Sequence, residues 1–268
     1  MFYNAHNGKI KTDNTYTNYL FFGKGNKNLI IIPGLGESFK LFKEMAIPMS
    51  IMYKKYAKDF KVYVFFRRTE LKSGFSTCDM ANDIIKHMDE LNIKSASIVG
   101  VSEGGMIAQY IAINAPKRVD KLVLTVTVAR PNEMLINNVD AWINMANNKD
   151  YKGIMLDTAN KSYTGKYLKK AKKMSSFLAK FDKNICYDRF YVEAEACKTH
   201  NSYSLLDKII CPTLIIGGKK DQVLGITGSY ELHSKIVNSE LYIYDELSHG
   251  LYEQASDFND RVYNFLKK

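Results

Sequence analysis

The strongest constraint on this chain of 268 residues is a regular alternation of short apolar runs with longer helical patterns. The run Leu29-Ile30-Ile31-Ile32 is apolar at every position and stops at Pro33-Gly34, as a strand buried on both faces should. Similar runs follow at residues 62–66, 97–101, 122–126, 213–216 and 241–244. Strands that alternate with helices favour a parallel sheet covered on both faces. The sequence therefore predicts an α/β fold with a mostly parallel, doubly wound sheet.

Residues 131–206 interrupt this alternation, because they contain no convincing strand and have the pattern of several helices. An insertion at this place is expected to cover the carboxyl edge of the sheet, where ligands bind in such folds. We therefore predict an α/β core of residues 1–130 and 207–268 and a helical cap of residues 131–206. The segment before residue 28 contains glycines, asparagines and aromatic runs, which predicts an antiparallel hairpin at the sheet edge.

One predicted cap helix has an apolar face surrounded by lysines. This face consists of Leu168, Ala171, Met174, Leu178 and Phe181. A basic amphipathic helix can contact a membrane surface. We favour the alternative that this face packs over a pocket and lines it together with Trp142. No apolar run is long enough for stable membrane insertion.

The most informative motif is Gly100-Val101-Ser102-Glu103-Gly104-Gly105. A predicted strand runs directly into Gly100, and a helical pattern begins after Ser102, so the serine lies on a tight strand-to-helix turn. Such a turn pushes the side chain out above the sheet, while the glycines let the backbone pass close by. The G-x-S-x-G pattern alone is weak, but its place between strand and helix makes Ser102 a candidate nucleophile.

A nucleophilic serine needs a base, and His249 has the best position for it. His249 follows the run 241–244 and precedes the last helical pattern, so it lies in a loop at the same sheet edge as Ser102. His87 and His233 fall inside helical patterns, and the side chain of His87 is expected to face solvent. We therefore predict His249 as the catalytic base.

The base in turn needs an acid that fixes its tautomer. Asp221 follows the run 213–216 through two glycines and two lysines, which again places it at the carboxyl edge of the sheet. An aspartate in this setting is also a common turn residue. Asp245 and Glu246 are rivals, but they lie directly before His249 and would reach its ring with difficulty. We predict Asp221 as the residue that orients His249.

Acyl transfer also needs hydrogen-bond donors for the oxyanion. The turn Pro33-Gly34-Leu35-Gly36-Glu37-Ser38 directly follows the first parallel strand and can aim a backbone N–H group inward. We predict the N–H groups of Leu35 and Glu103 as the oxyanion hole. The turn lacks the Lys-Ser/Thr ending and the glycine spacing of a phosphate-binding loop.

Taken in order, the motifs P-G-L-G-E-S, G-V-S-E-G-G, G-G-K-K-D and S-H-G resemble those of the α/β-hydrolase superfamily, and in particular its cap-bearing, esterase-like branch. The resemblance covers residues 28–268 and includes the segment 108–124. Pro33 stands where many members carry His, and Gly225 stands where Pro often follows the acid, which leaves the substrate subfamily open. The resemblance implies serine as nucleophile, histidine as base, aspartate as its partner, and no cofactor.

The balance of 38 basic against 28 acidic residues gives a formal charge of +10, which raises the question of a nucleic-acid partner. Most of the basic residues are lysines spread along the chain, whereas phosphate and base recognition favour arginine, so we expect no such partner.

Arg67 and Arg68 follow the second predicted parallel strand and could contact an anionic substrate, although an exposed loop is the simpler interpretation.

The four cysteines lack C-x-x-C spacing, and the first residues lack the pattern of a secretory signal, so we expect reduced thiols and a cytoplasmic location. No histidine, cysteine or acidic residues have the spacing of zinc or calcium ligands, so no metal is expected.

These observations together predict a serine hydrolase that cleaves a small carboxylic ester with an apolar acyl part. Thioesters, lactones and C–C bonds beside a carbonyl are alternatives, as is cofactor-free peroxidation on the same triad. A non-catalytic small-molecule receptor is the alternative outside the enzymes. The oligomeric state is left open.

Overall fold

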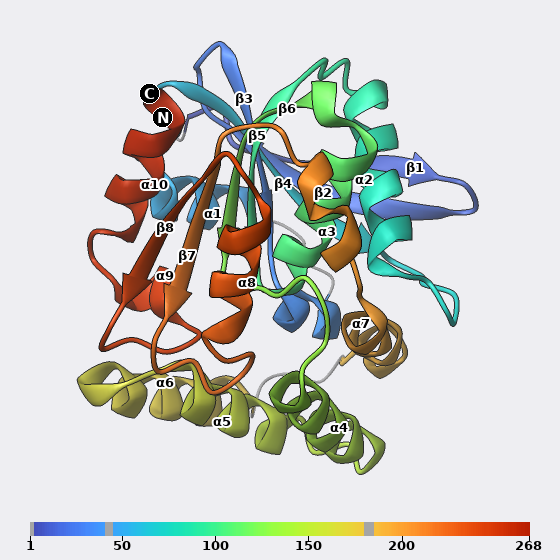
Figure 1. The fold of residues 1–268 in the computed structure, drawn as a ribbon. Helices are drawn as coiled ribbons and strands as arrows, with labels where there is room; N and C mark the ends of the chain where they lie inside the picture. Colours follow the sequence, from blue (N-terminus) through green and yellow to red (C-terminus); the bar gives the residue numbers. More distant parts are fainter. Residues whose placement is uncertain (1–2, 41–44, 180–184) are drawn as a thin grey trace.

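A computed structural model describes residues 3–40, 45–179 and 185–268 (Figure 1). Its centre is an eight-stranded sheet with the strand order β1-β2-β4-β3-β5-β6-β7-β8. The strands are β1 (His6–Thr12), β2 (Thr15–Phe22), β3 (Lys27–Ile32), β4 (Phe60–Arg68), β5 (Ala96–Val101), β6 (Val119–Thr125), β7 (Thr213–Gly218) and β8 (Ser239–Tyr244). Strands β1, β2 and β4 pair antiparallel, and every other pair is parallel. The predicted sheet and its N-terminal hairpin are confirmed.

The apolar runs form strands because both faces of the sheet are buried. Along β3, Ile30 and Ile32 point into one apolar layer, while Leu29 and Ile31 point into the opposite layer. All four side chains are at most 4% exposed. A strand of this kind must be apolar at every position, which is the pattern seen in the sequence.

Helices cover both faces of this sheet (Figure 1). The first layer contains residues of α2 (Thr77–Glu90), α3 (Glu103–Asn114) and α8 (Thr227–Lys235). The opposite layer contains residues of α1 (Ala46–Met52), α9 (Leu251–Gln254) and α10 (Phe258–Lys267). Short 3-10 helices connect other elements: η1 (Leu35–Phe39), η2 (Pro116–Arg118) and η3 (Tyr203–Lys208).

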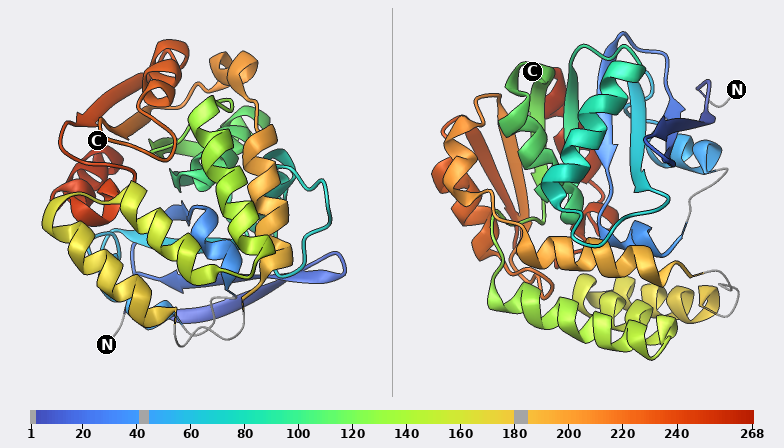
Figure 2. Two further views of the ribbon diagram at one scale, coloured as in Figure 1. Left: turned by 90° about the horizontal axis from the view of Figure 1, so that it is seen from below. Right: turned by 90° about the vertical axis from the view of Figure 1, so that its right-hand side faces the viewer.

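Four helices stand between β6 and β7: α4 (Glu133–Asn147), α5 (Tyr151–Ser162), α6 (Gly165–Leu178) and α7 (Tyr187–Thr199). They lie together below one end of the sheet (Figures 1 and 2). An apolar cluster joins α4, α5 and α7 to the core; it includes Trp142 of α4, Phe190 of α7 and Met106 of α3. The predicted helical insertion is confirmed, while its division from the core at residues 131 and 206 stays a prediction.

The position of β3 in the sheet decides where a site can form. Because β3 lies between β4 and β5, the chain leaves it in one direction and later returns on its other side, which makes a topological switch point. Ile32 of β3 pairs with Gly100 of β5, so the turns that follow these two strands leave the sheet side by side. No helix within the described ranges is long and apolar enough to span a bilayer.

Candidate active site

Ser102 occupies a strained turn between β5 and α3. Its backbone has φ 55° and ψ −119°, a left-handed conformation that a residue with a side chain adopts at a cost of about 1–3 kcal/mol. Gly104 permits the turn, because a Cβ atom there would lie only 2.0 Å from the carbonyl oxygen of Ile32. The G-x-S-x-G motif thus lets the first turn of α3 pack directly against the end of β3.

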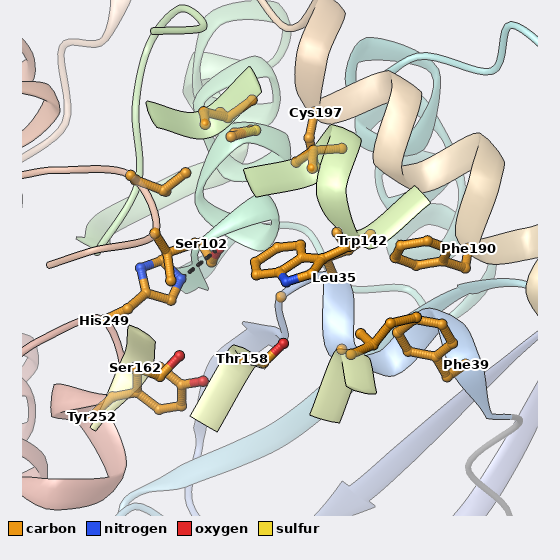
Figure 3. Close-up of a pocket in the computed structure, with 18 of the residues that line it drawn as sticks. Leu35, Phe39, Ser102, Trp142, Thr158, Ser162, Phe190, Cys197, His249 and Tyr252 are labelled. Carbon is orange, nitrogen blue, oxygen red and sulfur yellow. Dashed lines mark hydrogen bonds between the residues drawn. The ribbon is translucent and has the colours of Figure 1, made fainter. Parts of the chain in front are cut away.

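His249 and Asp221 meet Ser102 in a continuous hydrogen-bonded series. The Nε2 atom of His249 lies 3.0 Å from Oγ of Ser102 (Figure 3). Its Nδ1 atom lies 2.8 Å from Oδ2 of Asp221. Both His249 and Asp221 are 7% exposed, so little water competes for these bonds. The three residues come from the loops after β5, β7 and β8, which end at one edge of the sheet. The structure therefore brings together the three residues predicted from the sequence.

The backbone after β7 holds the Asp221 carboxylate in place. Its Oδ1 atom accepts hydrogen bonds from the N–H groups of Val223 at 2.8 Å and Leu224 at 3.0 Å. This leaves Oδ2 for His249. The rivals Asp245 and Glu246 are exposed and pair with Lys219 and Lys220 instead.

The other histidines lie away from Ser102. His6 and His233 are exposed, whereas His87 and His200 are each only 2% exposed. The expectation that His87 faces solvent is wrong, because the β1–β2 hairpin covers it and Thr12 Oγ1 lies 2.9 Å from its Nε2 atom. Burial lowers the pKa of His87 to about 4 and that of His200 to about 3, so both are neutral at pH 7.

The turn after β3 runs beside Ser102, as its place in the sheet requires. A Cβ atom on Gly34 would lie 3.1 Å from Cβ of Ser102. Leu35 begins η1 and Glu103 begins α3, and the first N–H groups of a helix have no carbonyl partner within it. The two predicted oxyanion donors thus belong to helix starts on either side of the serine.

The cavity at Ser102 has a volume of about 140 Å³ and is mainly apolar (Figure 3). Helices α4, α5 and α7 roof it, with Trp142 among the lining residues as predicted. The prediction that the face of residues 168–181 lines it is wrong for the described residues: none of α6 reaches the cavity, and Met174 is 49% exposed. The side chain of Leu178 and the whole of Phe181 lie outside the described residues. The α6 segment packs against α5, and α5 residues line the cavity.

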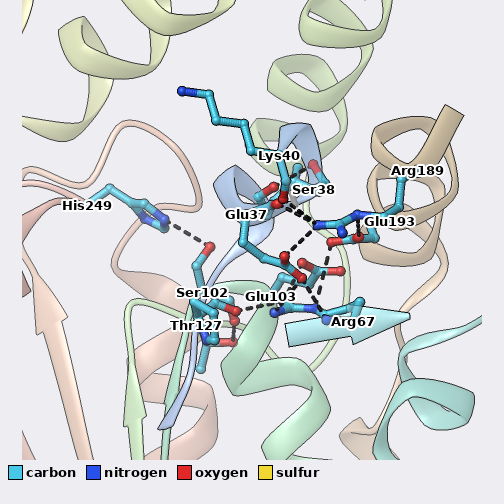
Figure 4. A network of polar contacts seen from close by, with 12 residues as sticks. Glu37, Ser38, Lys40, Arg67, Ser102, Glu103, Thr127, Arg189, Glu193 and His249 are labelled. Atoms are coloured by element: carbon cyan, nitrogen blue, oxygen red, sulfur yellow. Dashed lines mark hydrogen bonds and ion pairs between the residues drawn. The ribbon is translucent and has the colours of Figure 1, made fainter. Parts of the chain in front are cut away.

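A cluster of charged side chains next to Ser102 was missed in the sequence. It consists of Glu37, Arg67, Glu103, Arg189 and Glu193 (Figure 4). The expectation of an exposed loop is wrong for Arg67, which is 4% exposed and contacts three carboxyl groups. The one sequence feature that could have indicated this cluster is a charged residue next to or within an apolar or Gly-rich segment. Arg67 directly follows the apolar run 62–66, and Glu37 lies in the Gly-rich turn after β3.

The described cysteines are unpaired, and Cys197 is among the residues that line the cavity. Cys78, Cys186, Cys197 and Cys211 are all free thiols. Within residues 3–40, 45–179 and 185–268, no group of three or more histidine, cysteine or acidic side chains is placed to hold a metal ion.

The comparison with known proteins agrees with the fold of this chain. The family model described as alpha/beta hydrolase fold matches residues 27–256. A curated relative, 3-oxoadipate enol-lactonase 2 of Acinetobacter baylyi, is 22% identical over 262 residues, which cover 94% of this chain and 93% of the relative. Serine hydrolase BPHL of Mus musculus is 25% identical over 276 residues, with 97% and 86% covered. The crystal structure of MGS-M2, an alpha/beta hydrolase enzyme from a deep-sea metagenome library of the Medee basin, superposes with a TM-score of 0.85 at 18% identity, with 97% and 98% covered.

Proposed function

Because this chain belongs to the α/β-hydrolase fold family, we propose that it is a serine hydrolase with Ser102 as nucleophile, His249 as general base and Asp221 as the residue that orients the imidazole. The observation that carries this proposal is the series of hydrogen bonds from Ser102 through His249 to Asp221 at the wall of an apolar cavity. A nucleophile, a base in contact with it and an acid in contact with the base are the parts that acyl transfer requires.

The geometry supports a two-step reaction. Ser102 Oγ attacks the ester carbonyl carbon while His249 Nε2 takes the hydroxyl proton, and the carbonyl oxygen becomes an oxyanion between the N–H groups of Leu35 and Glu103. Collapse of this intermediate breaks the bond to the alcohol, which receives the proton from His249 and leaves. Water then attacks the acyl-enzyme, His249 accepts one of its protons, and the carboxylic acid is released as Ser102 regains its hydrogen.

The cavity favours a small, neutral acyl group. Its described lining contains no lysine, arginine, aspartate or glutamate side chain. The relative named 3-oxoadipate enol-lactonase acts on a derivative of a dicarboxylic acid, but here no described cationic side chain lines the cavity to pair with a second carboxylate. A dry cavity of roughly 150 Å³ accommodates benzene, so about 140 Å³ leaves room for about six carbon-sized atoms.

Hydrolysis of 4-nitrophenyl esters of increasing acyl length tests this proposal. Each methylene buried in the cavity contributes about 0.8 kcal/mol, or about a fourfold rise in kcat/KM, until the space is filled. We expect kcat/KM to rise from acetate to butyrate or hexanoate and then to fall sharply. A flat profile would show that the acyl chain does not occupy this cavity.

The charge of the substrate is tested separately by comparing 4-nitrophenyl butyrate with the hemisuccinate ester, which has a similar length and ends in a carboxylate. Burying an unpaired carboxylate is costly, so we expect at least about a hundredfold preference for the butyrate. Equal rates would contradict the neutral-substrate assignment.

A lactone is a cyclic ester, so its alcohol and acyl parts remain one molecule after the ester bond is cleaved. The match to the enol-lactonase relative covers 94% of this chain, so lactones belong in the same panel of substrates. The peroxidase, C–C hydrolase and receptor alternatives are separated by direct assays: halogenation with acetate and peroxide, cleavage beside a ketone, and binding without turnover.

A further inference from the structure

Five charged side chains are buried on the side of Ser102 that faces away from His249 (Figure 4). We call them the buried charge cluster: Glu37, Arg67, Glu103, Arg189 and Glu193, none more than 4% exposed. They come from η1, β4, α3 and α7, so they connect the core to the inserted helices. Removing an ion from water costs several kcal/mol even in a relaxed protein, so such a cluster calls for a functional explanation.

One guanidinium nitrogen joins the two segments that carry the proposed oxyanion donors. Nη2 of Arg67 donates to the carbonyl oxygen of Pro33 at 2.7 Å and to Oε2 of Glu103 at 2.6 Å. Pro33 lies two residues before Leu35, and Glu103 itself directly follows Ser102. A single atom of Arg67 therefore bridges the two donor segments.

Glu37 ties the same turn to the backbone of β4 and to α7. Its carboxylate accepts the backbone N–H of Arg67 at 2.9 Å and pairs with the guanidinium of Arg189, which also donates to the Glu37 carbonyl oxygen. The Nε atom of Arg189 lies 3.2 Å from Oε1 of Glu193, whose other oxygen lies 3.7 Å from Nε of Arg67. The turn is thus held from the sheet and from the cap at once.

The cluster contains two arginines and three carboxyl groups, so it is neutral when one carboxyl group is protonated. Burial raises the pKa of Glu193 well above its usual range, and both oxygens of Glu193 lack a hydrogen-bond partner among the described residues. Glu193 is therefore the least favourable of the three carboxyl groups for carrying a negative charge. Glu37 and Glu103 remain the carboxyl groups that hold Arg67 and Arg189 in place.

We propose that Arg67 is a positioning residue that sets the distance between the Leu35 and Glu103 N–H groups, and so the fit of the oxyanion hole. This inference rests on the proposed function. Oxyanion donors act within about 2.7–3.1 Å of the developing charge, and a misplacement of about 1 Å can reduce the rate about a hundredfold. Arg67 acts only through the two donors, because its own guanidinium contacts the Pro33 carbonyl and the carboxyl groups.

The test is Arg67→Lys, which keeps the positive charge but replaces the fork of donors by one ammonium group. Its matched control is Arg68→Lys: Arg68 is the next residue, pairs with Asp83 and Asp13, and does not line the cavity. For each variant, kcat, KM and the ratio of kcat/KM for an ester and its thionoester are measured. The thiono sulfur is a larger and weaker hydrogen-bond acceptor, so this ratio reports on the oxyanion hole.

We expect Arg67→Lys to lower kcat about a hundredfold, to change KM less than about threefold, and to reduce the ester-to-thionoester ratio at least about tenfold. Arg68→Lys should leave all three within about twofold. A kcat loss that is equal for ester and thionoester would show a merely structural role and overturn the inference, as would an unchanged kcat.

If Arg67→Lys does not fold, Glu103→Gln decides the matter, because it keeps the side-chain shape while weakening the bond to Nη2. Its ester-to-thionoester ratio should fall in the same direction, and an unchanged ratio would overturn the inference. Failure of the proposed function has a different signature, since the wild type would then hydrolyse no ester or Ser102→Ala would remain active.

Discussion

Replacing Asp221 by asparagine changes a single atom that faces the imidazole. In the wild type, Oδ1 of Asp221 accepts the backbone N–H groups of Val223 and Leu224, at 2.8 and 3.0 Å, while Oδ2 lies 2.8 Å from Nδ1 of His249. The asparagine oxygen must stay with the two backbone donors, so its NH₂ group faces His249. Nδ1 can then only accept a hydrogen bond, the ring proton moves to Nε2, and Nε2 can no longer take the proton of Ser102.

The size of the effect follows from this loss of the correct tautomer. In a serine hydrolase triad, the same exchange costs about 10⁴-fold in kcat, which corresponds to about 5 kcal/mol in the activation barrier. The fold should be unaffected, because asparagine has the same shape and keeps both backbone hydrogen bonds. We therefore expect Tm to change by less than about 3 °C.

The assay is steady-state hydrolysis of 4-nitrophenyl butyrate, with thermal unfolding of each variant measured in parallel. Asp245→Asn is the matched control, because Asp245 is exposed, pairs with Lys219 and lies on the same loop as His249. We expect this control to retain activity within about twofold. A loss of tenfold or less in Asp221→Asn, or an equal loss in Asp245→Asn, would refute the assignment of Asp221.

Two further predictions concern the nucleophile and the buried carboxyl groups. A fluorophosphonate probe should label the wild type at one residue and leave Ser102→Ala unlabelled, as read by intact-protein mass spectrometry; labelling of the variant would remove Ser102 from its proposed role. Burial raises the pKa of Glu103 to about 7 and that of Glu193 well above its usual range, so both groups stabilise the fold fully below about pH 4.5 and lose this contribution as the pH rises through their folded-state values. Between about pH 5 and pH 9, Tm should therefore fall more steeply in the wild type than in Glu193→Gln, and equal slopes in thermal unfolding would contradict the prediction.

The sequence alone was sufficient for the elements and for the order of the candidate catalytic residues, because both depend on local patterns. A strand buried on both faces must be apolar throughout, as Leu29–Ile32 is, and a serine between strand and helix needs nearby glycines. Parallel strands also end at a common edge, so Ser102, Asp221 and His249 could be expected to converge before their distances were known.

The surroundings of each side chain were decided only by the tertiary structure. His87 and Arg67 were expected in contact with solvent, but His87 is covered by the β1–β2 hairpin and Arg67 by η1 and α7. The apolar residues of α6 matched a pocket lining, yet the cavity is lined by α5, against which α6 packs, and by no described residue of α6. Helical periodicity indicates which residues share a face of a helix, but it does not indicate which other segments pack against that face. A buried charge needs partners from distant segments, such as Glu103 for Arg67, and no local spacing in the chain encodes that pairing.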